Sequence, residues 1–163
     1  LGSENINQVQ TLVAELIEDL EIMKALLLTA ESEAALDSWG VMCPSRMPIT
    51  VARNQFIRMY PRMIEIIQLL GSSSLMALPT EADLNGPLSD YVNQYMDTDN
   101  SSAKERIELF RLAWDLSCSA FGSRQVLYER YFQGDWMRNV SVLFGSYSTD
   151  KFVEQVKDLL RTD

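Results

Sequence analysis

Hydrophobic and polar residues alternate with a helical period over most of this chain. In residues 6–36 apolar side chains recur every three or four positions, while acidic side chains fill the opposite face. The apolar positions are Val9, Leu12, Val13, Leu16, Ile17, Leu20, Met23 and Leu27, and the acidic ones are Glu15, Glu18, Asp19 and Glu21. This pattern predicts a first amphipathic helix of about 30 residues.

A second helix is predicted from about Thr50 to Leu70, after a connection that is rich in glycine and proline. Pro61 lies inside this helix, and because proline has no backbone N–H to donate, we expect a kink or break near Tyr60. Gly71 and three serines follow. They predict either a simple helix end, with Gly71 in the left-handed conformation, or a nest of N–H groups and hydroxyls that can approach a phosphate.

The middle of the chain predicts shorter elements. Residues 75–86 are too apolar for a solvated linker, which indicates an ordered loop, and residues 87–96 predict a short helix. Ser102 with Glu105 forms a capping-box pattern that begins a long helix. The helical period continues past Gly122 to Tyr131, and the glycine within it indicates a kink or a close approach of another segment.

Two further helices are predicted at the C-terminal end. Asp135 is placed to cap a helix that runs to Phe144, and Ser148 or Thr149 to cap a last helix that ends near Arg161. Together these segments predict an all-α helical bundle, and residues 1–163 are expected to form a single domain. We interpret the tryptophans as anchors of its core; they are Trp39, Trp114 and Trp136.

The amino-acid composition excludes or disfavours several classes of function. The chain has 163 residues and a formal charge of −9, and this acidic balance disfavours nucleic acid as a partner. It has no histidine, which removes imidazole catalysis and histidine-ligated metal within the chain. Cys43 and Cys118 are too few for a thiolate metal site or a disulfide framework, so we expect free thiols and a cytoplasmic protein. No apolar run is long enough to predict a membrane span.

Charge is distributed unevenly. In residues 38–79 every basic residue is an arginine, and the only acidic residue is Glu65. The arginines are Arg46, Arg53, Arg58 and Arg62. Arginine binds carboxylates and phosphates through two parallel hydrogen bonds, which lysine does not do. Two interpretations stay open, namely ion pairs with the acidic first helix and a site for an anionic ligand.

Several strings occur in one order and resemble the 4-hydroxyphenylacetate 3-hydroxylase family. They are YPRMIE at 60–65, QLLGSSSLMALP at 68–79, RLAWD at 111–115, FGSRQ at 121–125 and YERYFQGD at 128–135. The resemblance covers only the helical C-terminal domain of that family. It therefore implies that residues 1–163 are the C-terminal fragment of a larger enzyme. The fragment lacks the part of that enzyme that holds the substrate pocket.

The resemblance implies a function. Members of this family are the oxygenase half of two-component monooxygenases: a separate flavin reductase supplies reduced FAD, and O2 is used to hydroxylate a phenol beside its hydroxyl group. Their fold is similar to that of the acyl-CoA dehydrogenases, whose helical bundle forms the core of a homotetramer. The implied cofactor is FAD, as FADH2, the implied substrate is a small phenol, and the fragment alone is expected to be inactive.

The resemblance also implies site residues. In the wider fold a glutamine followed by a glycine-rich turn contacts the phosphate or adenosine part of the flavin, and a second stretch contacts the flavin as well. The matching positions are Gln68, Gly71, Ser72, Ser73 and Ser74 for the first and Phe132, Gln133, Gly134 and Asp135 for the second. Serines replace the usual extra glycines. No catalytic residue and no metal ligand is expected in this chain.

Two alternatives remain from the sequence. The first is a domain of a 4-hydroxybutyryl-CoA dehydratase-like flavoenzyme, which adds an iron–sulfur cluster to the same scaffold. The second is a helical oligomerisation module without a ligand, which the long amphipathic first helix and the acidic surface would also suit.

Overall fold

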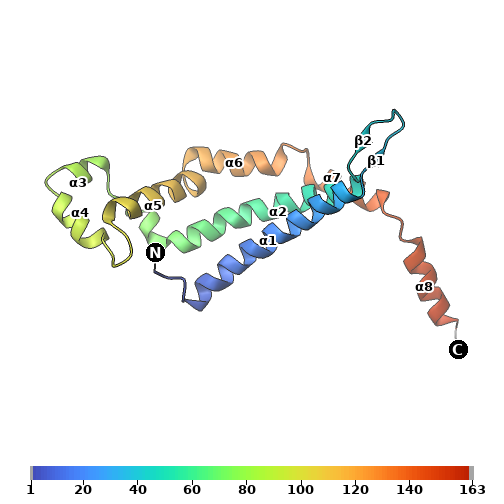
Figure 1. The fold of residues 1–163 in the computed structure, drawn as a ribbon, viewed down its shortest axis with the longest axis horizontal. Helices are drawn as coiled ribbons and strands as arrows, with labels where there is room; N and C mark the ends of the chain where they lie inside the picture. Colours follow the sequence, from blue (N-terminus) through green and yellow to red (C-terminus); the bar gives the residue numbers. More distant parts are fainter. Residues whose placement is uncertain (1, 162–163) are drawn as a thin grey trace.

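The computed structural model describes residues 2–161, and it is mainly helical (Figure 1). This confirms the predicted all-α class. The elements, in chain order, are α1 (Asn7–Ser32), β1 (Ala35–Leu36), β2 (Met42–Cys43), α2 (Arg46–Gly71), the 3₁₀ helix η1 (Ser72–Leu75), α3 (Glu81–Asn85), α4 (Ser89–Met96), α5 (Ala103–Ser117), α6 (Ala120–Tyr131), α7 (Trp136–Ser146) and α8 (Asp150–Leu160).

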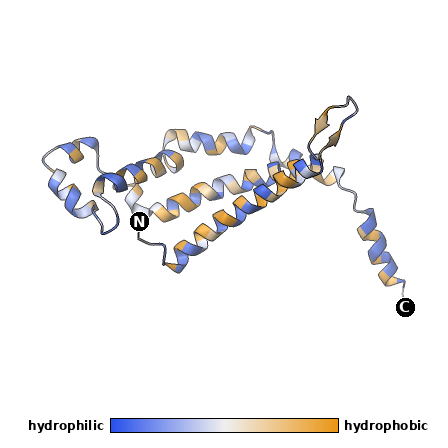
Figure 2. Cartoon of the chain, viewed as in Figure 1, coloured by the Kyte–Doolittle hydropathy of each residue, from blue (hydrophilic) through white to orange (hydrophobic). Residues whose placement is uncertain are grey.

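The long helices α1 and α2 lie antiparallel, side by side (Figure 1). Both carry hydrophobic residues along their length (Figure 2), which is the pattern that the sequence period predicts. Arg62 on α2 links the two helices: its guanidinium donates two hydrogen bonds, of 2.6 and 2.8 Å, to the Glu15 carboxylate on α1. The amide of Ser45 donates to the Ala30 carbonyl oxygen at 2.8 Å and holds the start of α2 against the end of α1.

A small β-hairpin joins α1 to α2, in place of the last turn of helix and the plain connection that the sequence predicts. Ala35 pairs with Cys43 and Leu36 with Met42. The Asp37 carboxylate stabilises the turn by accepting the backbone N–H groups of Trp39 and Val41, both at 2.9 Å. This local carboxylate bonding favours a turn over a continued helix.

The predicted break at Pro61 is wrong, because α2 is continuous from Arg46 to Gly71. Proline removes one hydrogen bond of the helix, but the residues on either side of it are buried in the bundle, including Ile57 and Ile64. Tertiary packing therefore holds the helix together across the missing bond. The helix also begins four residues earlier than predicted.

The predicted long helix after Ser102 is two helices, α5 and α6, which meet at Cys118 and Ser119. The hydroxyl of Ser119 caps α6 by accepting the N–H of Gly122 at 3.0 Å. A Cβ atom on Gly122 would lie 2.6 Å from the carbonyl oxygens of Asp115 and Leu116. This confirms the predicted close approach, since only glycine lets α6 turn back against the end of α5.

The other cap predictions have mixed outcomes. The capping box of Ser102 and Glu105 and the Asp135 cap of α7 are confirmed. Thr149 precedes α8, but its side chain makes no capping hydrogen bond. The predicted loop of residues 75–86 contains α3, whose capping box the sequence analysis missed.

The core is small and lies where α2 meets α5. Ile66 and Ile107 are its largest fully buried side chains. The prediction of three tryptophan anchors is wrong within this chain, because Trp39 is 87% exposed, Trp136 40% and Trp114 37%. Many other large apolar side chains are exposed on α1, α6, α7 and α8. Among residues 2–161, no helix combines the length and apolar character needed to cross a membrane.

Candidate functional site

The first predicted cofactor segment forms a corner at the end of α2, which we call the serine corner (Gly71 to Ser74). Gly71 is not left-handed as expected, because it completes α2 with φ −76°, and Ser72 takes the positive φ of 49° instead. Leu75 folds back beneath Gly71, where a Cβ atom would lie 2.6 Å from the Leu75 Cγ. Glycine is therefore needed here for close packing rather than for its backbone angle.

The serine corner presents free hydroxyl groups. Ser72 and Ser73 are exposed and Ser74 is half-buried. Within residues 2–161, no hydrogen bond occupies the hydroxyls of Ser72 and Ser73, whereas other serines of the chain, such as Ser117 and Ser119, donate to backbone carbonyls. The corner can therefore donate at least two hydrogen bonds to an external oxyanion.

Gln68 connects the serine corner to the joint between α5 and α6. Its amide Nε2 donates to the Ser117 carbonyl oxygen at 2.6 Å and lies 3.9 Å from the Cys118 Sγ. The amide nitrogen is thus engaged within the chain, which leaves the Gln68 carbonyl oxygen for other contacts. Sequence analysis missed Ser117 and Cys118, since they are 49 and 50 positions away and no local pattern links them to Gln68.

The second predicted segment lies where α6 gives way to α7. Phe132 is 50% exposed and stacks on Tyr128 with ring centroids 5.2 Å apart. The Gln133 Oε1 accepts a 2.6 Å hydrogen bond from the Nε of Arg53. Gly134 has φ +91°, which allows the turn, and the Asp135 carboxylate caps α7 through the Met137 N–H.

The chain does not bring the two segments together. Gln68 lies near the C-terminal end of α2, whereas Gln133 contacts Arg53 in its first half. Fifteen helical residues separate these two positions of α2, which corresponds to about 22 Å along the axis. Within one chain the segments therefore form two separate sites.

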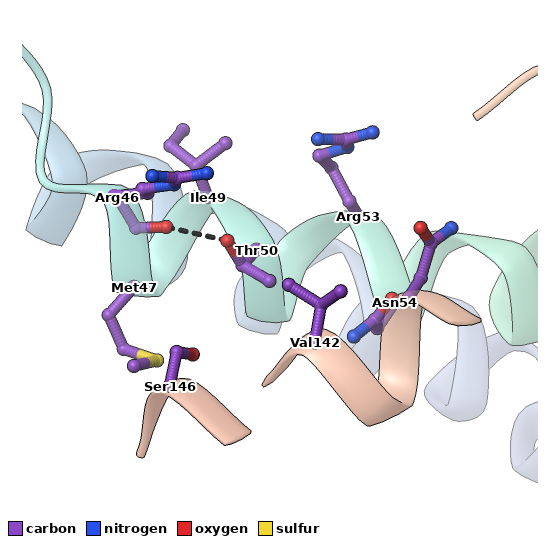
Figure 3. Close-up of a pocket in the computed structure, with 9 residues that line it drawn as sticks. Arg46, Met47, Ile49, Thr50, Arg53, Asn54, Val142 and Ser146 are labelled. Carbon is purple, nitrogen blue, oxygen red and sulfur yellow. Dashed lines mark hydrogen bonds between the residues drawn. The ribbon is translucent and has the colours of Figure 1, made fainter. Parts of the chain in front are cut away.

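A groove of about 470 Å³ lies between the start of α2 and residues 139–146 of α7 (Figure 3). Arg46 and Arg53 line it, together with Met47, Ile49, Thr50, Asn54, Asn139, Val142 and Ser146. The sequence left a site for an anionic ligand open for the arginine-only segment, but it did not indicate this groove or the contribution of α7 to it. A smaller depression of about 140 Å³ lies on α6 and is lined by Phe121, Arg124, Gln125 and Tyr128.

The four arginines of that segment have different partners. Arg62 pairs with Glu15 and Glu65, and this confirms pairing with the acidic first helix for one of them. The hydrogen bond from Arg62 holds the pKa of the Glu15 carboxyl below its ordinary value. Arg58 lies over the Trp136 ring, 5.7 Å from its centroid. Arg46 and Arg53 have no carboxylate partner among residues 2–161.

No cluster of three or more acidic or cysteine side chains is arranged to hold a metal ion within residues 2–161. Cys43 and Cys118 are free thiols.

Comparison with known proteins agrees with this architecture. The family described as HpaB, 4-hydroxyphenylacetate 3-hydroxylase C terminal, matches residues 1–161. The 4-hydroxyphenylacetate 3-monooxygenase oxygenase component of Thermus thermophilus is 40% identical over 161 residues, which are 99% of this chain and 34% of that protein. A probable 4-hydroxyphenylacetate 3-monooxygenase of Bacillus subtilis is 41% identical over 155 residues, 95% of this chain and 32% of that protein.

Solved structures show the same likeness. The crystal structure of the oxygenase component HpaB complexed with FAD superposes with a TM-score of 0.93 at 40% identity, and the match covers 99% of this chain and 34% of that one. A 4-hydroxybutyryl-CoA dehydratase from N. maritimus has a TM-score of 0.86 at 14% identity, covering 98% of this chain and 32% of that one, and shows the shared fold alone.

These matches define a fold class first: the chain is a helical bundle of the kind that HpaB and the dehydratase share. Sequence identity then distinguishes the two, at 40% to HpaB and 14% to the dehydratase. The chain belongs to the 4-hydroxyphenylacetate 3-hydroxylase family. It spans about a third of the length of the curated relatives, with 34% and 32% coverage of the two above.

Proposed function

We propose that residues 1–163 form the C-terminal helical domain of a flavin-dependent monooxygenase that hydroxylates a phenol beside its hydroxyl group. The observation that carries this proposal is the match of residues 1–161 to the family, together with the 0.93 TM-score to an oxygenase that holds FAD. The chain is about a third of such an enzyme, so we expect no turnover from it alone.

The residues of the serine corner suit the phosphate part of FAD. Ser72 and Ser73 offer free hydroxyl donors, and Gly71 lets Leu75 pack closely beneath the corner that presents them. FAD, when bound as its reduced form, supplies the oxygen-activating chemistry. The second segment suits a different part of a flavin, because the exposed Phe132 ring offers an apolar face while the Asp135 carboxylate would repel phosphate.

The chain's own residues bind and orient in this proposal. Gln68 positions the serine corner, since its hydrogen bond to Ser117 ties the end of α2 to the α5–α6 joint. The hydroxyls of Ser72 and Ser73 then hold the phosphates without any histidine. Because the two predicted segments are about 22 Å apart along α2, each contributes to a different flavin or to a different end of one.

The proposal extends to partners. HpaB has been solved with FAD and 4-hydroxyphenylacetate, and its relatives are named as oxygenase components. We infer a phenolic substrate, a separate flavin reductase and a homotetramer in which this bundle forms the core. The free thiols of Cys43 and Cys118 support a reducing compartment such as the cytoplasm.

Charge reversal at the serine corner tests the cofactor role. In the full-length protein that contains this chain, Ser72→Glu with Ser73→Glu should weaken binding of reduced FAD by roughly tenfold or more, because two carboxylates would face the phosphates. Thr11→Glu with Ser141→Glu adds the same charge at exposed helical positions elsewhere and should leave the affinity unchanged. Equal affinity of both variants and the wild type would refute the phosphate role.

The dehydratase shares only the fold with this chain, so its function is the alternative that the next experiment excludes or supports. Iron analysis of the full-length protein separates the two functions. We expect no iron–sulfur cluster, and a stoichiometric cluster would favour the dehydratase.

A further inference from the structure

The groove between α2 and α7 contains two cationic side chains that lie outside the serine corner, and one of them, Arg53, bonds to Gln133 of the second predicted flavin segment. Arg46 and Arg53 are both exposed at its edge, and no acidic side chain lines it (Figure 3). The protein as a whole carries a formal charge of −9, so carboxylates are plentiful elsewhere. An arginine pair without carboxylate partners in such a chain requires an explanation.

The hydrogen bonds and ion pairs of the arginines show how many of their N–H donors have no acceptor. Arg62, on the same helix, is saturated by the carboxylates of Glu15 and Glu65. Arg53 donates one hydrogen bond, to the neutral Gln133, and the Arg46 guanidinium makes no hydrogen bond or ion pair among residues 2–161. Each guanidinium therefore keeps most of its five N–H donors available.

The other polar groups of the groove also favour a ligand that accepts hydrogen bonds. The Asn54 Nδ2 is buried without a hydrogen-bond partner in the described chain, and it can only donate. The hydroxyls of Thr50 and Ser146 are committed to the carbonyl oxygens of Arg46 and Leu143. A ligand that accepts hydrogen bonds and carries negative charge would satisfy what the groove leaves open.

The spacing of the arginines suits an anion with two phosphoryl groups. Positions 46 and 53 are seven residues apart, so they share one face of α2, about 10 Å apart along the axis. Their guanidinium groups lie on the same side of the helix in Figure 3. Each guanidinium can donate a bidentate pair of hydrogen bonds, and a diphosphate offers one phosphoryl group to each of the two arginines.

We propose that the groove lined by Arg46, Arg53 and Asn54 binds the diphosphate group of a ligand. This site is separate from the serine corner, which lies at the other end of α2. The proposal does not depend on the assignment of the serine corner, since either site can fail alone.

Isothermal titration with inorganic pyrophosphate tests the groove, in the flavin-free full-length protein that contains this chain. Wild type should bind pyrophosphate, and Arg46→Gln with Arg53→Gln should lose affinity by roughly tenfold or more. Lys24→Gln with Lys104→Gln removes the same charge from exposed sites on α1 and α5 and should bind as wild type does. The single variant Arg46→Gln loses no side-chain hydrogen bond or ion pair within the described chain, so it should fold normally and still bind more weakly.

A competition arm identifies the source of the diphosphate. If FAD displaces pyrophosphate and the arginine variants also weaken FAD binding, the groove holds the diphosphate of the flavin itself. If FAD and pyrophosphate bind together, the groove holds a second, separate diphosphate ligand. No pyrophosphate binding by wild type, or equal binding by wild type and the double arginine variant, would overturn the proposal.

Discussion

At the scale of single residues, two glycines in helices of this chain differ in what a methyl group would meet. A Cβ on Gly122 would press on the Asp115 and Leu116 carbonyls at 2.6 Å, whereas nothing lies within 4 Å of one on Gly145. Gly122→Ala should therefore destabilise the fold by about 2 kcal/mol, since backbone cannot move aside cheaply. Gly145→Ala should stabilise it by about 0.5–1 kcal/mol, since alanine favours helix.

Urea unfolding followed by circular dichroism measures both changes. The midpoint should fall for Gly122→Ala and rise slightly for Gly145→Ala. Equal shifts for the two variants would contradict the close contact between α6 and the end of α5.

A second residue-scale prediction concerns acid. Hydrogen bonds from the backbone N–H groups of Val41 and Trp39 lower the pKa of the Asp37 carboxyl. A depressed pKa contributes stability above the unfolded value, about 3.9, and that contribution is lost as pH falls through the folded value. The β-hairpin should therefore be ordered at neutral pH and loosen in acid below about pH 4.

Amide chemical shifts of Val41 and Trp39, followed by NMR across this pH range, report the loosening. Asp37→Asn serves as the control, because its side chain does not titrate. An acid transition of the same size in Asp37→Asn would show that Asp37 is not the responsible group.

At the scale of elements, much of the helical pattern could be predicted because it depends on local chemistry. The apolar period and the capping residues predicted α1, α2 and α7, and the capping box at Ser102 predicted the start of α5. The division of α5 from α6 could not be found in this way. The apolar period runs through the joint, and the break depends on serine hydroxyls and on the fit of Gly122 against another helix.

The candidate site shows the same limit. Its residues near the end of α2 were predicted by resemblance, but the partner of Gln68 is 49 residues away and no local signal marks it. The groove of Arg46 and Arg53 was visible in the sequence only as a cluster of unpaired charge. Its depth depends on how α7 packs against α2, which is a tertiary property.

Caps provide a prediction at this scale. Ser102 accepts the Glu105 N–H and caps α5, whereas Thr149 makes no side-chain capping bond to α8. Ser102→Ala should cost about 1 kcal/mol of unfolding free energy, and Thr149→Ala should cost much less. Chemical denaturation compares the two, and a larger loss for Thr149→Ala would contradict the cap assignment.

At the scale of the whole molecule, the chain buries little and exposes much. Apolar side chains on α1, α6 and α8 remain at the surface, among them Leu20, Leu28, Phe121 and Val156, each at least 55% exposed. Surfaces of this kind mark contacts with other protein. In Figure 1 α8 extends away from the bundle, so its amphipathic face has no cover from the body of the chain.

We therefore expect the isolated 163-residue chain to self-associate. Sedimentation velocity should show species larger than the monomer at micromolar concentrations. Val153→Glu with Val156→Glu, on the exposed α8, should shift the distribution towards monomer, since it places charge on the apolar face. A strictly monomeric wild-type chain would argue against a core role in an oligomer.

The central claim is that the serine corner binds the phosphates of a flavin, and one measurement addresses it directly. A crystal structure of the full-length protein with bound FAD should place phosphate oxygens within hydrogen-bonding distance, about 2.7–3.2 Å, of the hydroxyl or backbone N–H groups of residues 71–74. A flavin bound elsewhere, with Ser72 and Ser73 facing solvent, would contradict the account.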